Sequence, residues 1–253
     1  MDNTVVSDVS LDNWITPGWF LLIALHLTPG ILITACYYTL SWSLTRAGIP
    51  AYTALMITIA VCLVPVELGI IGLWKVRTRD SGADSQVVMY RHRGSLTEYI
   101  IIPILLFVVS VVLSVIIHPL ILHLEPQFAS WVPKWAHSHG LIQELAYSSV
   151  SQRSHALLFG VLFSGLAAPI VEEVYFRGFL LPRMKSMGIL APILNTLLFA
   201  VYHFFAPWNA PAIFIAFLPI VFVVWLRKDC MIGAITHCMI NLWGVTQVFL
   251  EIS

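Results

Sequence analysis

Charged side chains are scarce in this chain. Its 253 residues include 13 basic and 13 acidic ones, together 10% of the sequence, while 59% of the residues are hydrophobic. Soluble domains are about 25% charged and 45–50% apolar, so a soluble fold of this length could not bury so much apolar surface. The composition predicts an all-α, polytopic membrane protein embedded in a lipid bilayer. A net charge of zero offers no basic surface that would indicate a nucleic-acid partner.

Several motifs of soluble enzymes are also missing. The sequence has no HExxH helix and no Gly-x-Ser-x-Gly elbow. The cysteines lie in or beside apolar stretches without CxxC spacing, which is typical of small buried residues rather than of disulfides or a zinc-thiolate site. They are Cys36, Cys62, Cys230 and Cys238. No lysine or arginine precedes Arg46, so the basic region of a cleaved signal peptide is missing and we expect the first hydrophobic segment to be retained.

Long hydrophobic runs make up most of the chain. A transmembrane helix needs about 20 mostly apolar residues, and about seven segments are candidates. They cover residues 17–42, 51–74, 99–122, 155–181, 188–205, 210–226 and 230–250. The aromatic-rich segment 123–154 is typical of a stretch at the membrane interface. We therefore expect one membrane domain in two parts: residues 1–154 hold three spans and the interfacial segment, and residues 155–253 hold the remaining spans.

The distribution of lysine and arginine predicts the orientation, because short cytoplasmic loops are enriched in these residues. With a cytoplasmic N-terminus, nine fall in inside loops, three in outside loops and Arg177 in the membrane. The inside residues are Lys75, Arg77, Arg79, Arg91, Arg93, Arg183, Lys185, Arg227 and Lys228, and the outside residues are Arg46, Lys134 and Arg153. We predict a cytoplasmic N-terminus and an outside C-terminus, in a bacterial cytoplasmic membrane or, in a eukaryote, in the endoplasmic reticulum.

Two adjacent carboxylates and an arginine interrupt the fourth hydrophobic segment. An ionisable residue inside a membrane costs roughly 2.5–3.5 kcal/mol on insertion scales, so by default it indicates function and faces the protein interior. Glu173 and Arg177 lie four residues apart and share a helix face, so they can form an ion pair. Glu172 points about 100° away from Glu173 on a helix and is left to face something else.

Two later hydrophobic segments carry one histidine each. Phe199 and His203 share a helix face, as do His237 and Asn241, because each pair is four residues apart. Together with Glu172, these groups suit peptide hydrolysis. A carboxylate beside a histidine can act as general base on a water, and a second imidazole and a carboxamide can donate hydrogen bonds to the oxyanion. A Glu/His/His set could instead hold a zinc-like divalent ion with an open position for water.

These residues resemble the motifs of a known family. The run from Glu172 to Arg177 matches the EExxxR motif of the CPBP intramembrane proteases, which include the type II CAAX prenyl endopeptidases and the Abi-like bacteriocin-processing proteins. Phe199 to His203 matches that family's FxxxH, and His237 to Asn241 matches its HxxxN. The three motifs occur in order, each on a hydrophobic segment. The resemblance covers roughly residues 155–250, and the first three spans carry no matching motif.

The resemblance implies an intramembrane endopeptidase that cuts a membrane-associated peptide or protein, such as a CAAX-type prenylated protein. Carried over by position, Glu172 would activate the water with the help of His203, and His237 and Asn241 would form the oxyanion site. The supporting residues would be Glu173 and Arg177. Whether the glutamate acts alone, or a divalent metal such as zinc is held by Glu172, His203 and His237, stays open. So do the substrate, the cleavage site and the oligomeric state.

Two other functions fit parts of the pattern. A non-catalytic binding or immunity protein would tolerate Glu172→Gln without loss of function. An ion or proton transporter would use Glu67, Glu172 and the histidines as a relay, and it requires a polar path through the first three spans. His26, Glu67 and His118 are the polar candidates there. We rank the protease first and the transporter last. We expect His26 and His118 to be satisfied core residues, and we leave Glu67 outside the site.

Overall fold

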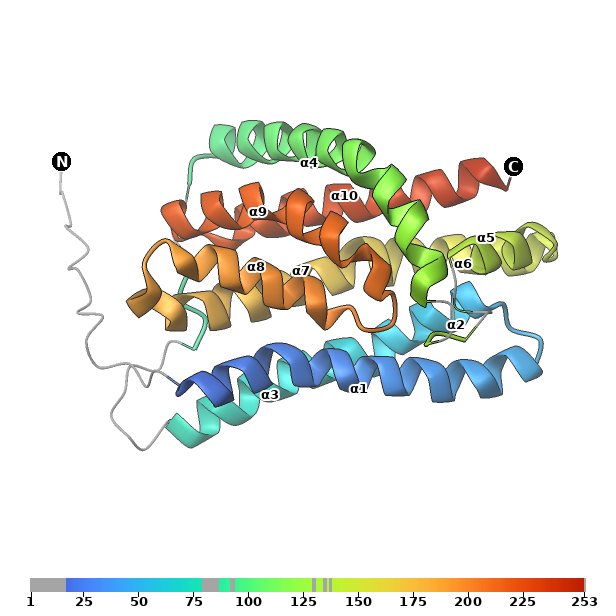
Figure 1. Cartoon of the computed structure of the whole chain (residues 1–253), viewed down its shortest axis with the longest axis horizontal. Helices are drawn as coiled ribbons and strands as arrows, with labels where there is room; N and C mark the ends of the chain where they lie inside the picture. Colours follow the sequence, from blue (N-terminus) through green and yellow to red (C-terminus); the bar gives the residue numbers. More distant parts are fainter. Residues whose placement is uncertain are drawn as a thin grey trace.

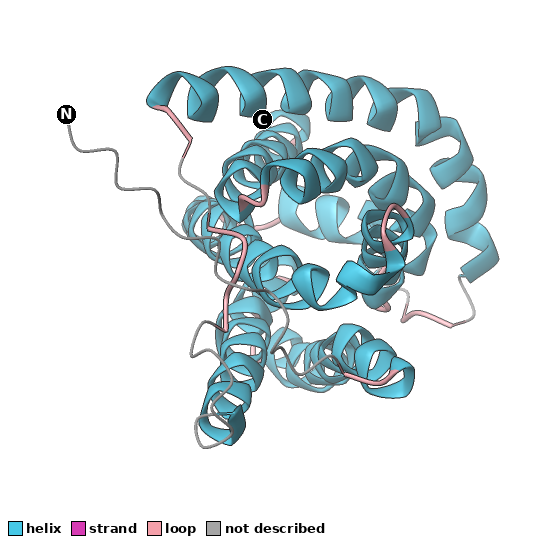
Figure 2. Ribbon diagram, turned by 90° about the vertical axis from the view of Figure 1, so that its left-hand side faces the viewer, coloured by secondary structure: helices cyan, strands magenta, loops and turns pink. Residues whose placement is uncertain are grey.

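The computed structural model describes residues 17–78, 87–91, 94–128, 131–133, 136 and 138–252. In these residues the regular secondary structure is helical, and the only β-type pairing is an isolated bridge between Arg91 and Asp229. Figures 1 and 2 show a bundle of helices. The prediction of an all-α membrane bundle is confirmed.

Ten α-helices and several tighter or wider turns follow one another along the described chain. The α-helices are α1 Trp19–Arg46, α2 Ala51–Thr58, α3 Val64–Thr78, α4 Leu96–Leu124, α5 Ser138–Ala146, α6 Val150–Phe159, α7 Ala168–Glu172, α8 Leu190–Tyr202, α9 Ala210–Arg227 and α10 Cys230–Glu251. π-helical turns at Ile59–Leu63, Gly160–Ala167 and Glu173–Leu180 join several of them end to end. The 3₁₀ turns are Glu125–Phe128, Leu181–Met187 and Pro207–Asn209.

Five continuous helical segments of the described chain are long and apolar enough to cross a membrane. They are Trp19–Arg46, Ala51–Thr78, Leu96–Phe128, Val150–Met187 and Pro207–Arg227. Each overlaps a predicted span, so the assignment as an integral membrane protein is confirmed. A sixth predicted span, 230–250, coincides with α10, which has 22 residues.

The segment predicted at 188–205 is shorter than a full span. α8 has 13 residues, so it is about 20 Å long, against about 30 Å for the hydrocarbon core of a bilayer. The preceding helix ends at Gly188, whose φ of +54° and ψ of −128° suit only glycine. The chain cannot continue as a helix through this residue, and α8 therefore begins two residues later.

The C-terminal helices lie between two parts of the N-terminal half. In Figure 1, α1 to α3 lie along one side of α7, α8, α9 and α10, and α4 covers the other side. The contacts agree, since α4 packs on α9 and α10 while α1 packs on α8. α4 bends in its second half (Figure 1), where Pro119 cannot donate a backbone hydrogen bond. The polar groups of the C-terminal helices are thereby enclosed by the first three spans.

The predicted interfacial segment contains helices that dock on the second span. Leu145 of α5 is fully buried. Glu144 accepts a hydrogen bond of 3.0 Å from the backbone N–H of Ala51, at the start of α2. This carboxylate caps α2, because the first backbone N–H groups of a helix lack partners within it. In its described residues, the segment is therefore helical in part and packed against the second span.

Some of the residues used for the orientation lie outside the described part of the chain. These are Arg79, Arg93 and Lys134. The cytoplasmic N-terminus and the outside C-terminus stay predictions.

Candidate active site

The fourth span changes its helical winding at the two carboxylates. α7 is a five-residue α-helical stretch between the π-helical segments Gly160–Ala167 and Glu173–Leu180. π-helical turns are rare and occur frequently at functional sites. The sequence pattern predicted a plain helix here, since hydrophobic periodicity carries no signal for a locally wider turn.

Glu173 and Arg177 form a completely buried ion pair. The distance from Nη1 of Arg177 to Oε1 of Glu173 is 3.1 Å, and neither side chain is exposed. The guanidinium also lies over the ring of Phe199, 4.0 Å from its centroid. The negative face of an aromatic ring attracts a cation, most strongly where water is excluded. The predicted pairing is confirmed, and Phe199 of the FxxxH motif is one of the surfaces that hold it.

Glu172 faces a cavity instead. The cavity has a volume of about 400 Å³, and His203, His237 and Asn241 line it together with Glu172. Glu173 and Arg177 do not line it. The sequence-predicted separation of the two carboxylates is therefore present in the structure: one is held by an arginine and the other faces the cavity.

His237 lies between the two carboxylates. Its Nδ1 atom is 3.3 Å from Oε1 of Glu173, and its Nε2 atom is 3.7 Å from Oε2 of Glu172. An N–H at Nδ1 would be donated to Glu173, since a carboxylate oxygen can only accept. That bond orients the ring so that Nε2 faces Glu172.

His203 is held by the residue four positions before it. It follows the last residue of α8, and its Nδ1 atom lies 2.9 Å from the carbonyl oxygen of Phe199. Because a carbonyl can only accept, Nδ1 carries the proton and Nε2 is left as an acceptor. A neutral imidazole with a free Nε2 suits a group that receives a proton from water.

Asn241 spans two helices. Its amide Nδ2 donates a hydrogen bond of 2.9 Å to the carbonyl oxygen of Ser164 in the first π-helical segment. This bond uses one of the two N–H groups of the amide, and Asn241 also lines the cavity. Asn241 can therefore bond to the neighbouring helical segment and line the cavity at the same time.

Two side chains that the sequence reasoning did not include join this cluster. The hydroxyl of Tyr202 donates to Oε1 of Glu67 at 2.8 Å and lies 3.3 Å from Oε1 of Glu172. Glu67 in α3, which we had left outside the site, is therefore one hydroxyl group away from Glu172. A lone carboxylate in an apolar span was its signal in the sequence, but Tyr202 had none.

The two histidines assigned to the core behave differently. His26 is fully buried, with Nδ1 2.8 Å from the carbonyl oxygen of Leu22 and Nε2 3.1 Å from Nδ2 of Asn195. That prediction is confirmed. His118 is exposed on α4, so the prediction of a core position is wrong there. α4 is apolar on all sides, so its sequence does not reveal which face is exposed.

A metal site finds no support in the described part of the chain. No group of three or more His, Cys, Asp or Glu side chains there is arranged to hold a metal ion. Glu172, His203 and His237 line one cavity without converging as a ligand set. Metal dependence therefore stays a prediction for experiment.

The comparison with protein families adds to this geometry. Residues 154–243 match the family model described as type II CAAX prenyl endopeptidase Rce1-like. Through this region, the chain is similar to the Rce1-like family. The region contains all three motifs and nearly coincides with the range of the predicted CPBP resemblance. No curated protein and no solved structure matches the chain.

The Rce1-like region supports a membrane protease of the CAAX type at the level of the family. A membrane environment and a peptide or prenylated protein substrate are consistent with that class. The region begins after the N-terminal half of the chain, so Glu67 and the cavity walls supplied by α1, α2 and α4 lie outside it.

Proposed function

We propose that this protein is an intramembrane endopeptidase in which Glu172 activates a water molecule for attack on a peptide carbonyl. One observation carries the proposal. Of two adjacent carboxylates, only Glu172 faces a cavity that His203, His237 and Asn241 also line, while Glu173 is held by Arg177. The Rce1-like match supports the class of reaction.

In the proposed reaction, Glu172 removes a proton from water while the water oxygen forms a bond to the carbonyl carbon. Nε2 of His203 accepts a hydrogen bond from the other O–H of the water, and this bond orients the water molecule. The tetrahedral intermediate then collapses, the C–N bond breaks, and the proton on Glu172 passes to the leaving amine. The products are a carboxylic acid and an amine, and no other reactant is required.

The negative charge that develops on the carbonyl oxygen needs hydrogen-bond donors. The second N–H of Asn241 is one proposed donor, and Nε2 of His237 is the other when the imidazole carries a proton on both nitrogens, since Nδ1 already donates to Glu173 and both side chains line the cavity beside Glu172. Glu173 holds the opposite ring nitrogen of His237, which fixes the direction of the imidazole. A preoriented donor stabilises the transition state without reorganisation, because it already points at the developing charge.

The remaining cavity wall is mostly apolar. It includes Leu55, Met56, Ile59, Ile213, Phe217 and Ile240. Such a wall favours an apolar segment over a charged peptide, since a charged side chain would lose its hydration there. We propose a membrane-associated substrate, with a CAAX-type prenylated protein as the first candidate and a hydrophobic peptide as the second.

The test compares wild type with Glu172→Gln, and with Glu251→Gln as a control at an exposed carboxylate. Each purified protein is incubated in detergent with a prenylated CAAX peptide and with a hydrophobic peptide library. We expect wild type and Glu251→Gln to cleave and Glu172→Gln to lose at least about 100-fold in rate, as expected for a general base. Equal cleavage by wild type and Glu172→Gln would remove Glu172 from the mechanism.

A chelator arm addresses the metal alternative. Activity that survives chelation supports the glutamate mechanism, whereas activity lost on chelation and restored by zinc supports a metal-bound water. A Glu172→Gln protein that keeps its cellular function while lacking cleavage would favour the non-catalytic binding protein.

A further inference from the structure

A carboxyl group from the second span reaches the candidate site through a tyrosine. Glu67 lies in α3, in the half of the chain that the family match does not cover. Its side chain is completely buried. Its Oε1 atom accepts a hydrogen bond of 2.8 Å from the hydroxyl of Tyr202, and the same hydroxyl lies 3.3 Å from Oε1 of Glu172. Tyr202 thus links Glu67 to the group proposed to activate the water.

The hydroxyl of Tyr202 has one proton and two carboxyl neighbours. A hydroxyl donates a single hydrogen bond, so it cannot donate fully to both carboxylates at once. The contact with Glu67 is 0.5 Å shorter than the contact with Glu172, which are 2.8 and 3.3 Å. An O–H···O bond is strongest near 2.7–2.8 Å. The proton is therefore donated to Glu67, and Oε1 of Glu172 keeps its lone pairs for other partners.

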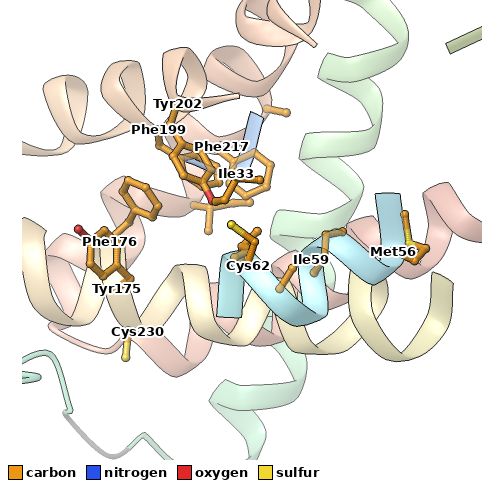
Figure 3. Packing of buried hydrophobic residues seen from close by; sticks show 14 of the residues in the cluster. Ile33, Met56, Ile59, Cys62, Tyr175, Phe176, Phe199, Tyr202, Phe217 and Cys230 are labelled. Atoms are coloured by element: carbon orange, nitrogen blue, oxygen red, sulfur yellow. The ribbon is translucent and has the colours of Figure 1, made fainter. Parts of the chain in front are cut away.

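Packing prevents Tyr202 from turning elsewhere. A Cβ atom on Gly30 would lie 2.1 Å from the backbone oxygen of Tyr202, so α1 touches α8 at this residue. The Tyr202 ring stacks on Phe199, with 5.9 Å between centroids and 13° between planes, and meets the edge of Phe176 at 5.0 Å. Figure 3 shows Tyr202 and Phe199 packed beside Phe217 and Ile33. In this position the hydroxyl contacts the two carboxyl groups.

A purely structural role does not account for a carboxyl group at position 67. Its second oxygen, Oε2, is buried and has no hydrogen-bond partner among the described residues. A buried polar atom without a partner destabilises a protein, and a carboxyl inside a membrane segment is more costly than an apolar side chain. Leucine at this position would be the more stable choice, yet it could not accept the Tyr202 proton.

We infer that Glu67 is a positioning residue: by holding the hydroxyl of Tyr202, it keeps Glu172 oriented toward the cavity and available to the water. The inference rests on the proposed role of Glu172. Without Glu67, the hydroxyl would turn to Glu172 as its remaining acceptor and occupy Oε1, one of the two oxygens that can receive the proton. Glu67 itself does not line the cavity, so it has no contact through which to bind the substrate.

The kinetic test uses Glu67→Leu, Glu67→Gln, Tyr202→Phe and the double variant Glu67→Leu/Tyr202→Phe. The control is Thr58→Val, a buried position in the same span whose hydroxyl bonds only to the carbonyl of Ala54. We expect Glu67→Leu to lower kcat by about tenfold, the effect of one hydrogen bond, with KM unchanged within about twofold. Glu67→Gln keeps an acceptor oxygen and should retain kcat within about twofold.

Two further results separate positioning from a structural role. The double variant should be no slower than the slower single variant, because both changes act through the same hydroxyl. Glu67→Leu should unfold at a temperature no lower than wild type, since Tyr202 still has Glu172 as acceptor. Two results would overturn the inference. One is a double variant whose loss of kcat equals the product of the losses in Glu67→Leu and Tyr202→Phe. The other is a loss of kcat that follows the loss of stability across the variants.

An infrared measurement decides the same question without a substrate. The carboxyl band of Glu172 is identified as the band that disappears in Glu172→Gln. We expect this band to shift in Glu67→Leu and to stay in place in Glu67→Gln and Thr58→Val. An unshifted band in Glu67→Leu overturns the inference, whatever the activity. Full activity in Glu172→Gln with a shifted band instead refutes the proposed function and leaves the Glu67–Tyr202–Glu172 contact standing.

Discussion

The guanidinium of Arg177 contacts a fully buried carboxylate in the candidate site. It pairs with Glu173 and lies on the ring of Phe199. Arg177→Met should lower the free energy of unfolding by about 3–5 kcal/mol, because Glu173 would be left as an uncompensated buried charge. Arg177→Lys should lower the free energy of unfolding by less than Arg177→Met does, since an ammonium keeps the charge but cannot stack as a plane. Denaturant unfolding in detergent measures both.

The same chain provides a control for this prediction. Arg227 forms an ion pair with Glu98 in which the two side chains are 38% and 34% exposed. Pairs of this kind are screened by solvent and contribute little. Arg227→Met should leave the unfolding midpoint nearly unchanged. A change as large as that of Arg177→Met would mean that burial does not distinguish the two pairs.

Gly233 gives Glu173 the room it occupies. A Cβ atom at this position would lie 2.4 Å from Oε2 of Glu173, and Glu173 is held by both Arg177 and His237. Gly233→Ala should therefore displace the carboxylate and reduce peptide cleavage by at least about tenfold, as misplacement of a supporting group does. The measurement is the rate of cleavage of the peptide that wild type cuts.

Gly244 on the same helix is the matched control. No atom lies within 4 Å of a Cβ built there. Gly244→Ala should keep full activity. A loss of activity in both variants would assign the effect to α10 as a whole rather than to Glu173.

At the scale of single residues, the sequence predicted some contacts and missed others for a physical reason. Glu173 and Arg177 are neighbours by helix geometry alone, and the opposite direction of Glu172 follows from the same geometry. Glu67 and Tyr202 are 135 positions apart. Their hydrogen bond exists only because α3 packs on α7 while α8 packs on the π-helical segment Glu173–Leu180 that follows it, and no spacing within a single helix encodes it.

At the scale of elements, α1 and α8 touch through backbone atoms. The Cβ of an alanine at Gly30 would meet the carbonyl oxygen of Tyr202 at 2.1 Å. A backbone atom cannot move away by changing rotamer, so the two helices would have to separate. Gly30→Ala should destabilise the protein by about 1–3 kcal/mol, as overpacking does, and should lower cleavage activity by displacing Tyr202. Thermal unfolding and the cleavage assay are measured on the same preparation.

Gly69 in α3 serves as the comparison, since no atom lies within 4 Å of a Cβ built there. Gly69→Ala should keep both the unfolding temperature and the activity. Wild-type behaviour of Gly30→Ala would show that α1 and α8 can separate without disturbing the site.

Hydropathy identified the helical segments well but not their internal winding. Five predicted spans overlap helices that can cross a membrane. The number of consecutive apolar residues decides whether a helix can cross a membrane, and this number can be counted in the sequence. The π-helical segments around α7 and the shortness of α8 depend on tertiary packing and on the backbone of Gly188, so hydrophobic periodicity does not reveal them.

For the whole molecule, the excess of basic residues in alternate loops predicts that the C-terminus lies outside the cytoplasm. Alkaline phosphatase fused after residue 252 should then be active, because it folds only outside, whereas a fusion after Thr78 should be inactive. A fluorescent protein at the same two positions should give the opposite pattern. An inactive phosphatase at the C-terminus would reverse the orientation.

The cavity takes its walls from both halves of the chain. Ile33, Met56 and Ile59 come from the first two spans, and Phe217 and Ile240 face them from α9 and α10. The groups proposed to break the peptide bond all come from residues 154–243. A change in the first two spans can thus reshape the chamber while the hydrolytic groups stay as they are. Substrate selectivity and the hydrolytic reaction can therefore change independently in this fold. Exchanging the N-terminal half is the direct way to give the same hydrolytic groups a different substrate.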